Sequence, residues 1–344
     1  MPIETVQIAR NDEVYECFPD CVKTTSGKII VIYRESEAHA CREFSDLVMR
    51  HSTDEGLTWS DRQVLIQSAK DDKALFKWNC PRVSQLSDGR LVALCDGYRI
   101  PPGEISTRDS RTFLWFSDDD GETWEGPEET PITGIVPDKI YETKAGTWLV
   151  AAHVGRKGQR GLWQRVFRST DSGESWEGPI DVAKRDGLNL CEASVIQLPD
   201  ERLVAYMREN SGKGWSAYKA ISEDDGKSWH GPYETHIPAC HRPVSGYLPS
   251  GRIMVTFAYM MPGTERNRAN FMAYTETPES AGSTSLQDQG GQLLCLDHDR
   301  SDHPDQGYCG WCVLDDDSLF VVNYINDDAP MAQIRGYFFT EDEF

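Results

Sequence analysis

The chain has 344 residues and carries 56 acidic against 35 basic side chains, a formal net charge of -21 at pH 7. This charge argues against nucleic acid or an anionic membrane as a partner. No stretch approaches the ~20 apolar residues that a transmembrane helix needs. The N-terminal residues lack a basic region followed by an apolar run, so no secretory signal is predicted. We therefore expect a cytoplasmic protein with reduced cysteines, or a secreted one if a signal has been removed.

In chain order, six units each predict a short strand, a turn, a second strand, a loop and a third strand. The turn and second strand carry the clearest signal, a glycine or a substitute followed by apolar residues. These segments are Gly27–Val31, Gly89–Val92, Gly146–Val150, Glu201–Val204, Gly251–Val255 and Asp317–Val321. Residues 281–303 show no strand pattern and are predicted to form a long loop.

The third strand of the first four units runs into a repeated phrase. Each copy has Ser, an acidic residue two places on, Gly two further, and then Thr or Ser beside Trp. A carboxylate that bonds backbone N–H groups and a glycine with positive φ are typical of a strand-connecting turn. The copies are Ser52–Trp59, Ser117–Trp124, Ser169–Trp176 and Ser222–Trp229, with starts 65, 52 and 53 residues apart.

Strand-rich units at this period predict an all-β, six-bladed β-propeller, with residues 1–344 as one domain. The four phrases resemble the Asp boxes, or BNR repeats, of the sialidase (neuraminidase) superfamily. The resemblance covers nearly the whole chain and implies the same propeller. In that superfamily the Asp boxes lie on the outer rim, so we expect them to be structural turns without a role in the chemistry.

The first strand of each blade should carry the functional side chains, because these strands line the axis of a propeller. Alignment on the turn glycine places two sets of residues at their starts, and alternation puts each set on one face. Nine residues before the glycine stand Phe18, Cys80, Pro137, Glu192, Arg242 and Tyr308. Seven residues before it stand Asp20, Arg82, Lys139, Ser194, Val244 and Gly310. Polar groups at one end of apolar strands predict a binding site there.

The resemblance implies that Tyr308 is a nucleophile and Glu192 its general base. Sialidases use a tyrosine in this role, an exception among glycosidases. The anomeric carbon of sialic acid carries a carboxylate, which would repel a negatively charged nucleophile. A neutral phenol that a glutamate deprotonates avoids this repulsion.

The resemblance also implies three arginines that hold the substrate carboxylate, a role suited to guanidinium geometry. Arg208 matches one of them, and Arg268 a second, with Arg266 as its rival. The first should come from a Phe-Arg-Ile-Pro motif, but residues 16–20 read Glu-Cys-Phe-Pro-Asp and lack the arginine. The other candidates for substrate binding are Arg242, His241, Arg82 and Arg34.

The general acid of the superfamily is an aspartate on the loop after the second strand of the first blade. Here that loop contains no aspartate before Asp46. Glu37, Glu43 and His39 on this loop, and Asp20 at the strand start, are therefore the candidate proton donors.

The leading hypothesis is a sialidase-like glycoside hydrolase that removes a terminal acidic sugar from a glycan. A second is a glycosidase or lyase of the same fold that acts on a polysaccharide with uronic acid or rhamnose; the missing arginine favours it. A third is a non-catalytic glycan-binding propeller, which would not need a base beside a phenol. No cofactor or metal is expected, and the C-x-x-C at residues 309–312 falls in a predicted strand. The sequence does not predict an oligomeric state.

Overall fold

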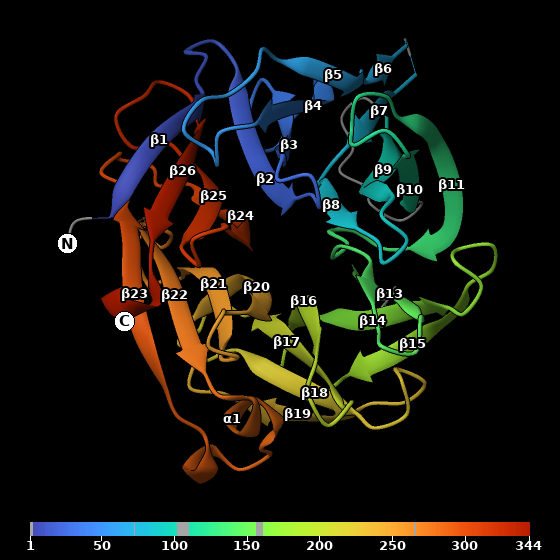
Figure 1. Cartoon of the computed structure of the whole chain (residues 1–344), viewed down its shortest axis with the longest axis vertical. Coiled ribbons are helices and arrows are strands. Elements are labelled where there is room, and N and C mark those ends of the chain that lie inside the picture. Colours follow the sequence, from blue (N-terminus) through green and yellow to red (C-terminus); the bar gives the residue numbers. More distant parts are fainter. Residues whose placement is uncertain (1–2, 72, 102–109, 156–160, 265) are drawn as a thin grey trace. The chain divides into compact units, whose positions relative to one another are not determined.

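A computed structural model describes residues 3–71, 73–101, 110–155, 161–264 and 266–344. Its elements are almost all β-strands, which pair into six antiparallel sheets (Figure 1). Sheets of sequential, neighbouring strands are the blades of a propeller. The prediction of an all-β, six-bladed β-propeller is therefore confirmed.

By their internal contacts the strands belong to two compact units. The first comprises Met1–Lys139 with Asp299–Glu343, and the second comprises Ile140–His298 with Phe344. The prediction of one domain over residues 1–344 stays a prediction.

The first unit contains three of the sheets. One consists of β2 (Tyr15–Lys23), β3 (Ile29–Ser36), β4 (Ser45–Ser52) and β5 (Gln63–Ile66). The next has the order β11-β10-β9-β7-β6 with β8 beside β9: β6 (Ala69–Lys70), β7 (Leu75–Trp78), β8 (Arg82–Gln85), β9 (Leu91–Ile100), β10 (Arg111–Ser117) and β11 (Glu125–Thr133). The third joins both ends of the chain: β1 (Glu4–Ala9), β26 (Gln333–Phe339), β25 (Leu319–Ile325) and β24 (Gln306–Val313).

The second unit contains the other three sheets, each with its strands in sequence order. The first of these is β12 (Tyr141–Glu142), β13 (Trp148–Gly155), β14 (Leu162–Ser169) and β15 (Glu177–Ala183). The next is β16 (Leu190–Gln197), β17 (Leu203–Glu209), β18 (Tyr218–Ser222) and β19 (His230–Glu234). The last is β20 (Cys240–Tyr247), β21 (Ile253–Tyr259), β22 (Asn270–Glu276) and β23 (Gly291–His298).

Helices are short and few in the described residues. They are α1 (Pro278–Gly282) and the 3₁₀ turns η1 (Leu286–Asp288) and η2 (Glu341–Glu343). In this part of the chain no helix has the length and apolar character needed to cross a membrane.

The outer, fourth strand of the sheets was not predicted, and one of these strands corrects the predicted loop. Residues 281–303 were expected to lack strands, but β23 (Gly291–His298) lies within them. Most of its side chains are exposed or half-buried, and those of β11 and β19 are similar. An edge strand that buries few side chains lacks the apolar alternation by which strands are recognised.

The cores lie between neighbouring sheets of each unit. In the first unit, Ile32 and Met49 of one sheet pack with Ala93 and Trp115 of the next. In the second unit a similar core joins β17 and β21. Fully buried strands of this kind read as continuous apolar runs, which is why the second strand of every unit was visible in the sequence.

The repeated phrases form closed turns, as predicted. In the first copy, Asp54 Oδ1 accepts the hydroxyl of Ser52 (2.7 Å) and the N–H of Thr58 (2.9 Å). Ser52 Oγ in turn accepts the N–H of Gly56, whose φ is 91°. The indole N–H of Trp59 donates to the Gly56 carbonyl at 3.0 Å. Equivalent aspartate bonds are made by Asp119, Asp171 and Asp224.

The turn between the first and second strands also behaves as its sequence predicts. Glycine provides positive φ in four units, and in the other two Glu201 and Asp317 take its place. These residues have φ of 71° and 65°, so the substitutes adopt the left-handed conformation of the glycine they replace. The alignment of inner strands on this position is therefore justified by the backbone.

Candidate active site

Three inner strands share a backbone distortion at the residue that the alignment singled out. Phe18, Glu192 and Arg242 have φ of 58°, 51° and 55°, and the strand pairing shifts at each of them. In β24 the left-handed residue is Gly307 (φ 105°), directly before Tyr308. A bulge re-aims a side chain, and left-handed non-glycine residues gather at functional sites. These bulges therefore mark the residues around which we build the site.

In the first unit, three aromatic rings pack around Phe18. Its ring centroid lies 4.6 Å from that of Tyr308 and 5.4 Å from that of Tyr324. The ring of His39 meets Phe18 edge-on at 5.1 Å. Tyr308 and His39, predicted as nucleophile and proton donor, thus both contact Phe18. We call Tyr15, Phe18, His39, Asp305, Tyr308 and Tyr324 the tyrosine cluster.

Asp305 organises the tyrosine cluster. This buried carboxylate accepts the hydroxyls of Tyr15 and Tyr324, the latter at 2.8 Å. Its Oδ2 lies 2.5 Å from Nδ1 of His39. A carboxylate at Nδ1 favours the tautomer with the proton on that nitrogen, which leaves Nε2 to exchange protons. The His39 side chain is 43% exposed, so a ligand can reach it.

Arg34 holds the loop that carries His39. Its guanidinium donates to the carbonyl of His39 at 2.7 Å and to Asn79 Oδ1 at 3.3 Å. It also stacks over the ring of Phe18, 4.4 Å from the centroid. The side chain is fully buried. These contacts favour a supporting role for Arg34 over the predicted contact with substrate.

Asp20 and Arg82 form a buried bridge between strands. Asp20 Oδ2 accepts the N–H of Val83 at 3.0 Å, and the Arg82 guanidinium donates to the carbonyl of Cys309 at 2.9 Å. Their charged groups lie 3.9 Å apart, and both side chains are inaccessible to solvent. The bridge joins β2, β8 and β24, so the charges of Asp20 and Arg82 have a structural role. It therefore favours neither Asp20 as proton donor nor Arg82 as substrate ligand.

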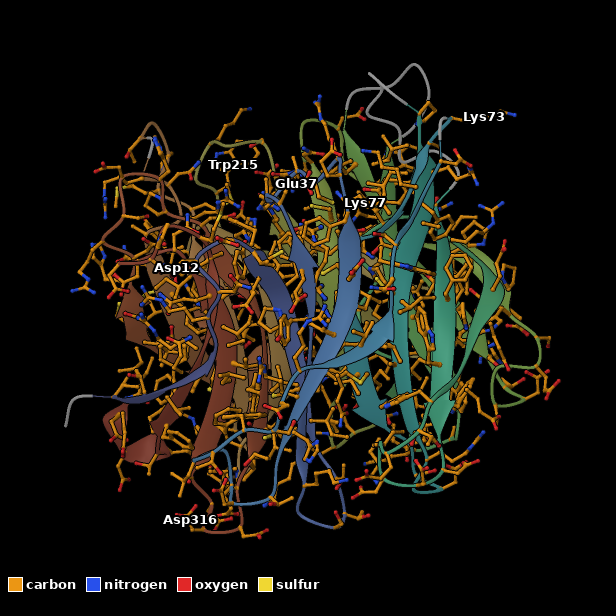
Figure 2. All side chains as sticks on the ribbon, turned by 90° about the horizontal axis from the view of Figure 1, so that it is seen from above. Asp12, Glu37, Lys73, Lys77, Trp215 and Asp316 are labelled. Carbon is orange, nitrogen blue, oxygen red and sulfur yellow. The ribbon has the colours of Figure 1, made fainter. Side chains whose placement is uncertain are left out.

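The two glutamates of the same loop are less suited to donate a proton than His39. Glu37 accepts the backbone N–H groups of Arg42, Glu43 and Phe44. Burial raises the pKa of Glu37, but these bonds lower it more, so its net pKa is below the usual value. Glu43 is largely exposed and pairs with Lys70. Figure 2 shows Glu37 at the end of the first unit opposite Asp316, which belongs to the β24–β25 turn.

In the second unit, Glu192 and Arg208 form a buried ion pair. Nη1 of Arg208 lies 2.9 and 3.0 Å from the two carboxylate oxygens of Glu192. Nη2 donates to Asn210 Oδ1 at 2.6 Å and contacts Met260 Sδ at 3.4 Å. The guanidinium is therefore fixed at the end of β17, where it can present a planar donor surface.

Two arginines and two histidines influence the pKa of the Glu192 carboxylate. Burial raises its pKa, but Arg208, His241, His153 and Arg242 lower it more, so the net pKa is well below the usual value. A carboxylate with a depressed pKa is a weak proton acceptor. Glu192 is better suited here to hold Arg208 than to act as a strong base. We call Glu192, Arg208, His153, His241 and Arg242 the glutamate cluster.

The remaining predicted substrate ligands lie in or beside the second unit's inner strands. Arg242 is fully buried on β20 and donates to the carbonyl of Ala193 at 3.5 Å. His241 is buried next to it. Arg268 is half-buried in the turn before β22. Of these, Arg268 has the exposure that contact with a ligand requires, and its role stays a prediction.

Three side chains of the second unit have metal-ligating atoms close together. Those of His153, Cys191 and Glu192 lie within 4.8 Å of one another. Burial lowers the pKa of His153 to about 4, although the charge of Glu192 opposes this effect, and burial raises the pKa of Cys191. A cation would lie beside Arg208 and would have to deprotonate a thiol that burial keeps neutral. The group is therefore better explained as buried core beside the Glu192–Arg208 ion pair than as a metal site.

Sequence reasoning missed Asp305 and its two tyrosine partners. Asp305 precedes Tyr308 by three residues, so proximity to the candidate nucleophile was the available signal. Tyr15 and Tyr324 lie 290 and 19 residues from Asp305, and only the fold brings their hydroxyls to its carboxylate. The structure also places His153 beside Glu192.

Comparison with solved structures defines the class. A Dyadobacter fermentans DSM 18053 protein of unknown function superposes with a TM-score of 0.80 at 22% identity, covering 98% of both chains. The Hadza microbial sialidase Hz136 gives 0.72 at 18% identity, covering 95% of this chain and 66% of that one. Trypanosoma rangeli sialidase in complex with sialic acid gives 0.70 at 14% identity, covering 97% and 58%. The fold is that of a sialidase-type β-propeller.

The family follows from the sequence profile. The BNR repeat-like domain family matches residues 43–283, and this chain belongs to that family. A curated sialidase from Bacteroides fragilis (strain YCH46) is 25% identical over 194 residues, which are 54% of this chain and 34% of that protein. The match thus spans about a third of the length of that relative. The predicted relationship to the sialidase superfamily is confirmed.

Proposed function

We propose that this protein is a sialidase-like glycoside hydrolase that removes a terminal acidic sugar from a glycan. One observation carries the proposal: Tyr308 and His39 both pack against Phe18, and Asp305 holds His39 through Nδ1. In a tyrosine-based displacement the phenol can serve as nucleophile, and an accessible histidine can serve as proton donor. The sialidase from Bacteroides fragilis supports the proposal at the level of the family.

The reaction would proceed in two displacements. In the first, the Tyr308 oxygen bonds to the anomeric carbon while the bond to the leaving glycan oxygen breaks, and that oxygen takes the Nε2 proton of His39, which must enter this step protonated on both ring nitrogens. In the second, water attacks the anomeric carbon, gives a proton back to Nε2, and releases the Tyr308 oxygen, which regains the proton that it lost in the first displacement. His39 thus acts first as acid and then as base.

The phenol of Tyr308 must lose its own proton in the first step. The resemblance assigns this proton to Glu192, and that assignment stays a prediction. Arg208 is the better supported member of the glutamate cluster, because its guanidinium is fixed by two acceptors and suits a carboxylate ligand. A carboxylate on the sugar is therefore the substrate feature that we expect Arg208 to bind.

The test is release of 4-methylumbelliferone from its sialoside by purified protein. We expect turnover by the wild type and a loss of roughly 10³-fold or more in Tyr308→Phe, because the covalent route is removed. Tyr233→Phe, on the outer strand β19, is the matched control and should retain full activity. Absence of turnover by the wild type, or equal activity of Tyr308→Phe, would overturn the proposal.

A second candidate function is favoured by the residue at the first bulge. Phe18 lies in the segment of residues 16–20, which lacks the arginine of the superfamily's Phe-Arg-Ile-Pro motif. The guanidinium over its ring is that of Arg34, which is fully buried. The missing arginine favours a substrate other than sialic acid, such as a polysaccharide with uronic acid, which His39 and Tyr308 could cleave by proton abstraction and elimination. An ultraviolet-absorbing unsaturated uronate among the products would identify such a lyase.

A further inference from the structure

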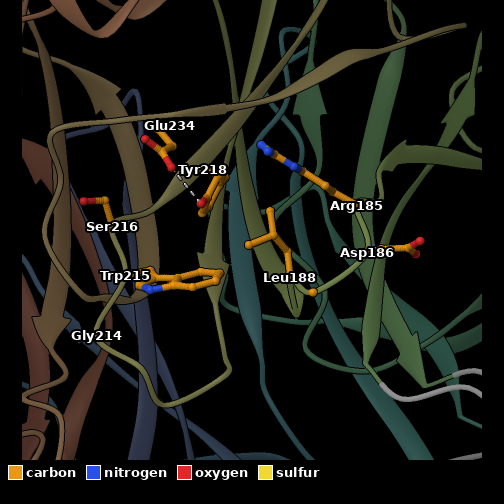
Figure 3. A pocket seen from close by; sticks show the side chains of 9 residues that line it. Arg185, Asp186, Leu188, Gly214, Trp215, Ser216, Tyr218 and Glu234 are labelled. Carbon is orange, nitrogen blue, oxygen red and sulfur yellow. Dashed lines mark hydrogen bonds between the residues drawn. The ribbon is translucent and has the colours of Figure 1, made fainter.

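Figure 3 shows a pocket of about 490 Å³ in the second unit; neither Glu192 nor Arg208 is among the residues that line it. Two loops form its walls: residues 184–189, which connect β15 to β16, and residues 210–217, which connect β17 to β18. The side chains that matter for its chemistry are Arg185, Asp186, Leu188, Trp215, Tyr218 and Glu234. None of the site predictions falls on these residues.

Trp215 is the central feature of this pocket. Its side chain is among the exposed large hydrophobic groups, at 41% exposure, although tryptophan is highly buried on average. Figure 3 shows the indole extending from one wall toward Leu188 on the other. The ammonium of Lys213 lies 4.7 Å from the ring centroid. An indole kept at the surface inside a pocket offers a flat apolar platform to a ligand.

Polar groups of both kinds surround the platform. The hydroxyl of Tyr218 donates to Glu234 Oε1 at 3.1 Å. Burial, then this carboxylate, raises the pKa of Tyr218 to about 12, so the phenol stays neutral. Arg185 extends from the opposite wall toward Tyr218 and Glu234, whereas the carboxylate of Asp186 points away from them (Figure 3). One cation and one carboxylate thus face the platform, a balance that does not select an anion.

The loop that carries Trp215 is held in place before any ligand binds. Gly214 has φ of 73°, and a Cβ at this position would lie 2.7 Å from Cγ of Pro262. At its end, the N–H of Ala217 donates to the carbonyl of Ile237 at 2.8 Å. A side chain at residue 214 would therefore displace the loop. The platform is preorganised, which lowers the entropic cost of binding.

We propose that this pocket binds a neutral pyranose within the glycan, as a site separate from the catalytic groups. The C–H face of a pyranose is apolar and matches the indole face of Trp215. Its hydroxyls can donate to Glu234 and accept from Arg185. That the neutral sugar belongs to the substrate glycan rests on the proposed function, whereas the binding itself does not.

The experiment is isothermal titration calorimetry of the whole protein with lactose, N-acetyllactosamine and cellobiose. These neutral disaccharides lack an acidic terminal sugar and are not expected to turn over. We expect at least one to bind, with affinity weakened roughly tenfold or more in Trp215→Ala. Trp215→Phe retains a ring and should lose much less. Leu57→Ala, another exposed apolar side chain, is the control and should bind as the wild type does.

Two results would overturn the inference: no binding of any of the three disaccharides, or equal binding by Trp215→Ala and the wild type. Because Trp215 is exposed, its replacement should leave the fold intact, which the unfolding temperature checks. Disaccharide binding that depends on Trp215 without any sialoside turnover would remove the proposed function and keep this site. Sialoside turnover without disaccharide binding would remove this site and keep the proposed function.

Discussion

The tyrosine cluster and the glutamate cluster share a backbone feature but differ in charge and in solvent exposure. Each begins at a left-handed bulge of an inner strand, at Phe18 in one and at Glu192 in the other. The tyrosine cluster pairs neutral phenols with a histidine that solvent reaches. The glutamate cluster contains a buried carboxylate whose charge is matched by Arg208.

This difference indicates which chemistry each cluster can support. Proton transfer needs a reachable group that can both donate and accept a proton, and the exposed imidazole of His39 is such a group. The Glu192 carboxylate is held ionised by its neighbours, so it provides fixed charge rather than a mobile proton. Bond cleavage by the tyrosine cluster belongs to the proposed function, and anion binding by the glutamate cluster stays a prediction.

The largest expected effect tests the fixed charge of the glutamate cluster. Arg208→Ala should lower the free energy of unfolding by about 3–5 kcal/mol, because it leaves the Glu192 carboxylate buried without its partner. Urea denaturation measures this change. Arg208→Ala combined with Glu192→Gln should recover much of the loss. Arg202→Ala, which breaks a surface pair with Asp200, should cost less than about 1 kcal/mol.

If Arg208→Ala unfolds no more easily than Arg202→Ala, the ion pair does not hold its cluster together, and the contrast between the two clusters fails.

A smaller effect concerns the positioning of His39. Asp305→Asn should reduce kcat/KM roughly 10²-fold on a substrate whose alkoxide leaving group must be protonated. The reason is that the amide no longer fixes the tautomer of His39. On the 4-methylumbelliferyl substrate, whose leaving group needs little protonation, the loss should be much smaller. His39→Gln should show the same dependence, and the double variant should be no worse than either single one.

A loss in Asp305→Asn that is equal for both leaving groups would indicate a merely structural role for the carboxylate. Urea denaturation of the variant separates that case from a change in stability.

The smallest effect is a pH dependence of stability in the first unit. Glu16 is buried on β2, and burial followed by the charge of Glu35 raises its pKa from 4.5 to about 8. The folded state thus favours the protonated acid. The associated stability is complete below pH 4.5 and is lost as the pH rises through about 8.

Glu16→Gln removes this titration. At pH 9 the variant should be more stable than the wild type by about 1 kcal/mol or more, and at pH 4 the two should be similar. Thermal unfolding at the two pH values measures the difference. A variant less stable than the wild type at pH 9 would show that the ionised form of Glu16 has a favourable partner.

Much of the fold could be predicted because its signals are local. The Ser-x-Asp-x-Gly turns need only residues four apart, as Asp54 and Thr58 show. The buried second strands are continuous apolar runs. The outer strands could not be found, because strands such as β23 are stabilised by pairing with a neighbour rather than by burial of their own side chains.

The candidate site was harder to predict, because the alignment gives a side chain's place but not its partners. It singled out Phe18, Glu192 and Tyr308, and the bulges confirm that two of these positions are backbone irregularities. It also selected Arg82, whose bonds go to backbone carbonyls of other strands. Asp305 has no unusual local sequence, and its role depends on side chains that the fold brings from elsewhere.

The central claim is that Tyr308 forms the covalent bond to the sugar. Its most direct test is peptide mapping by mass spectrometry after incubation with a 2,3-difluoro sialic acid, whose fluorines slow release of the bound sugar. The account predicts a mass increase on the peptide that contains Tyr308, and none on that peptide in Tyr308→Phe. An adduct on another residue, or no adduct in an active wild type, would contradict it.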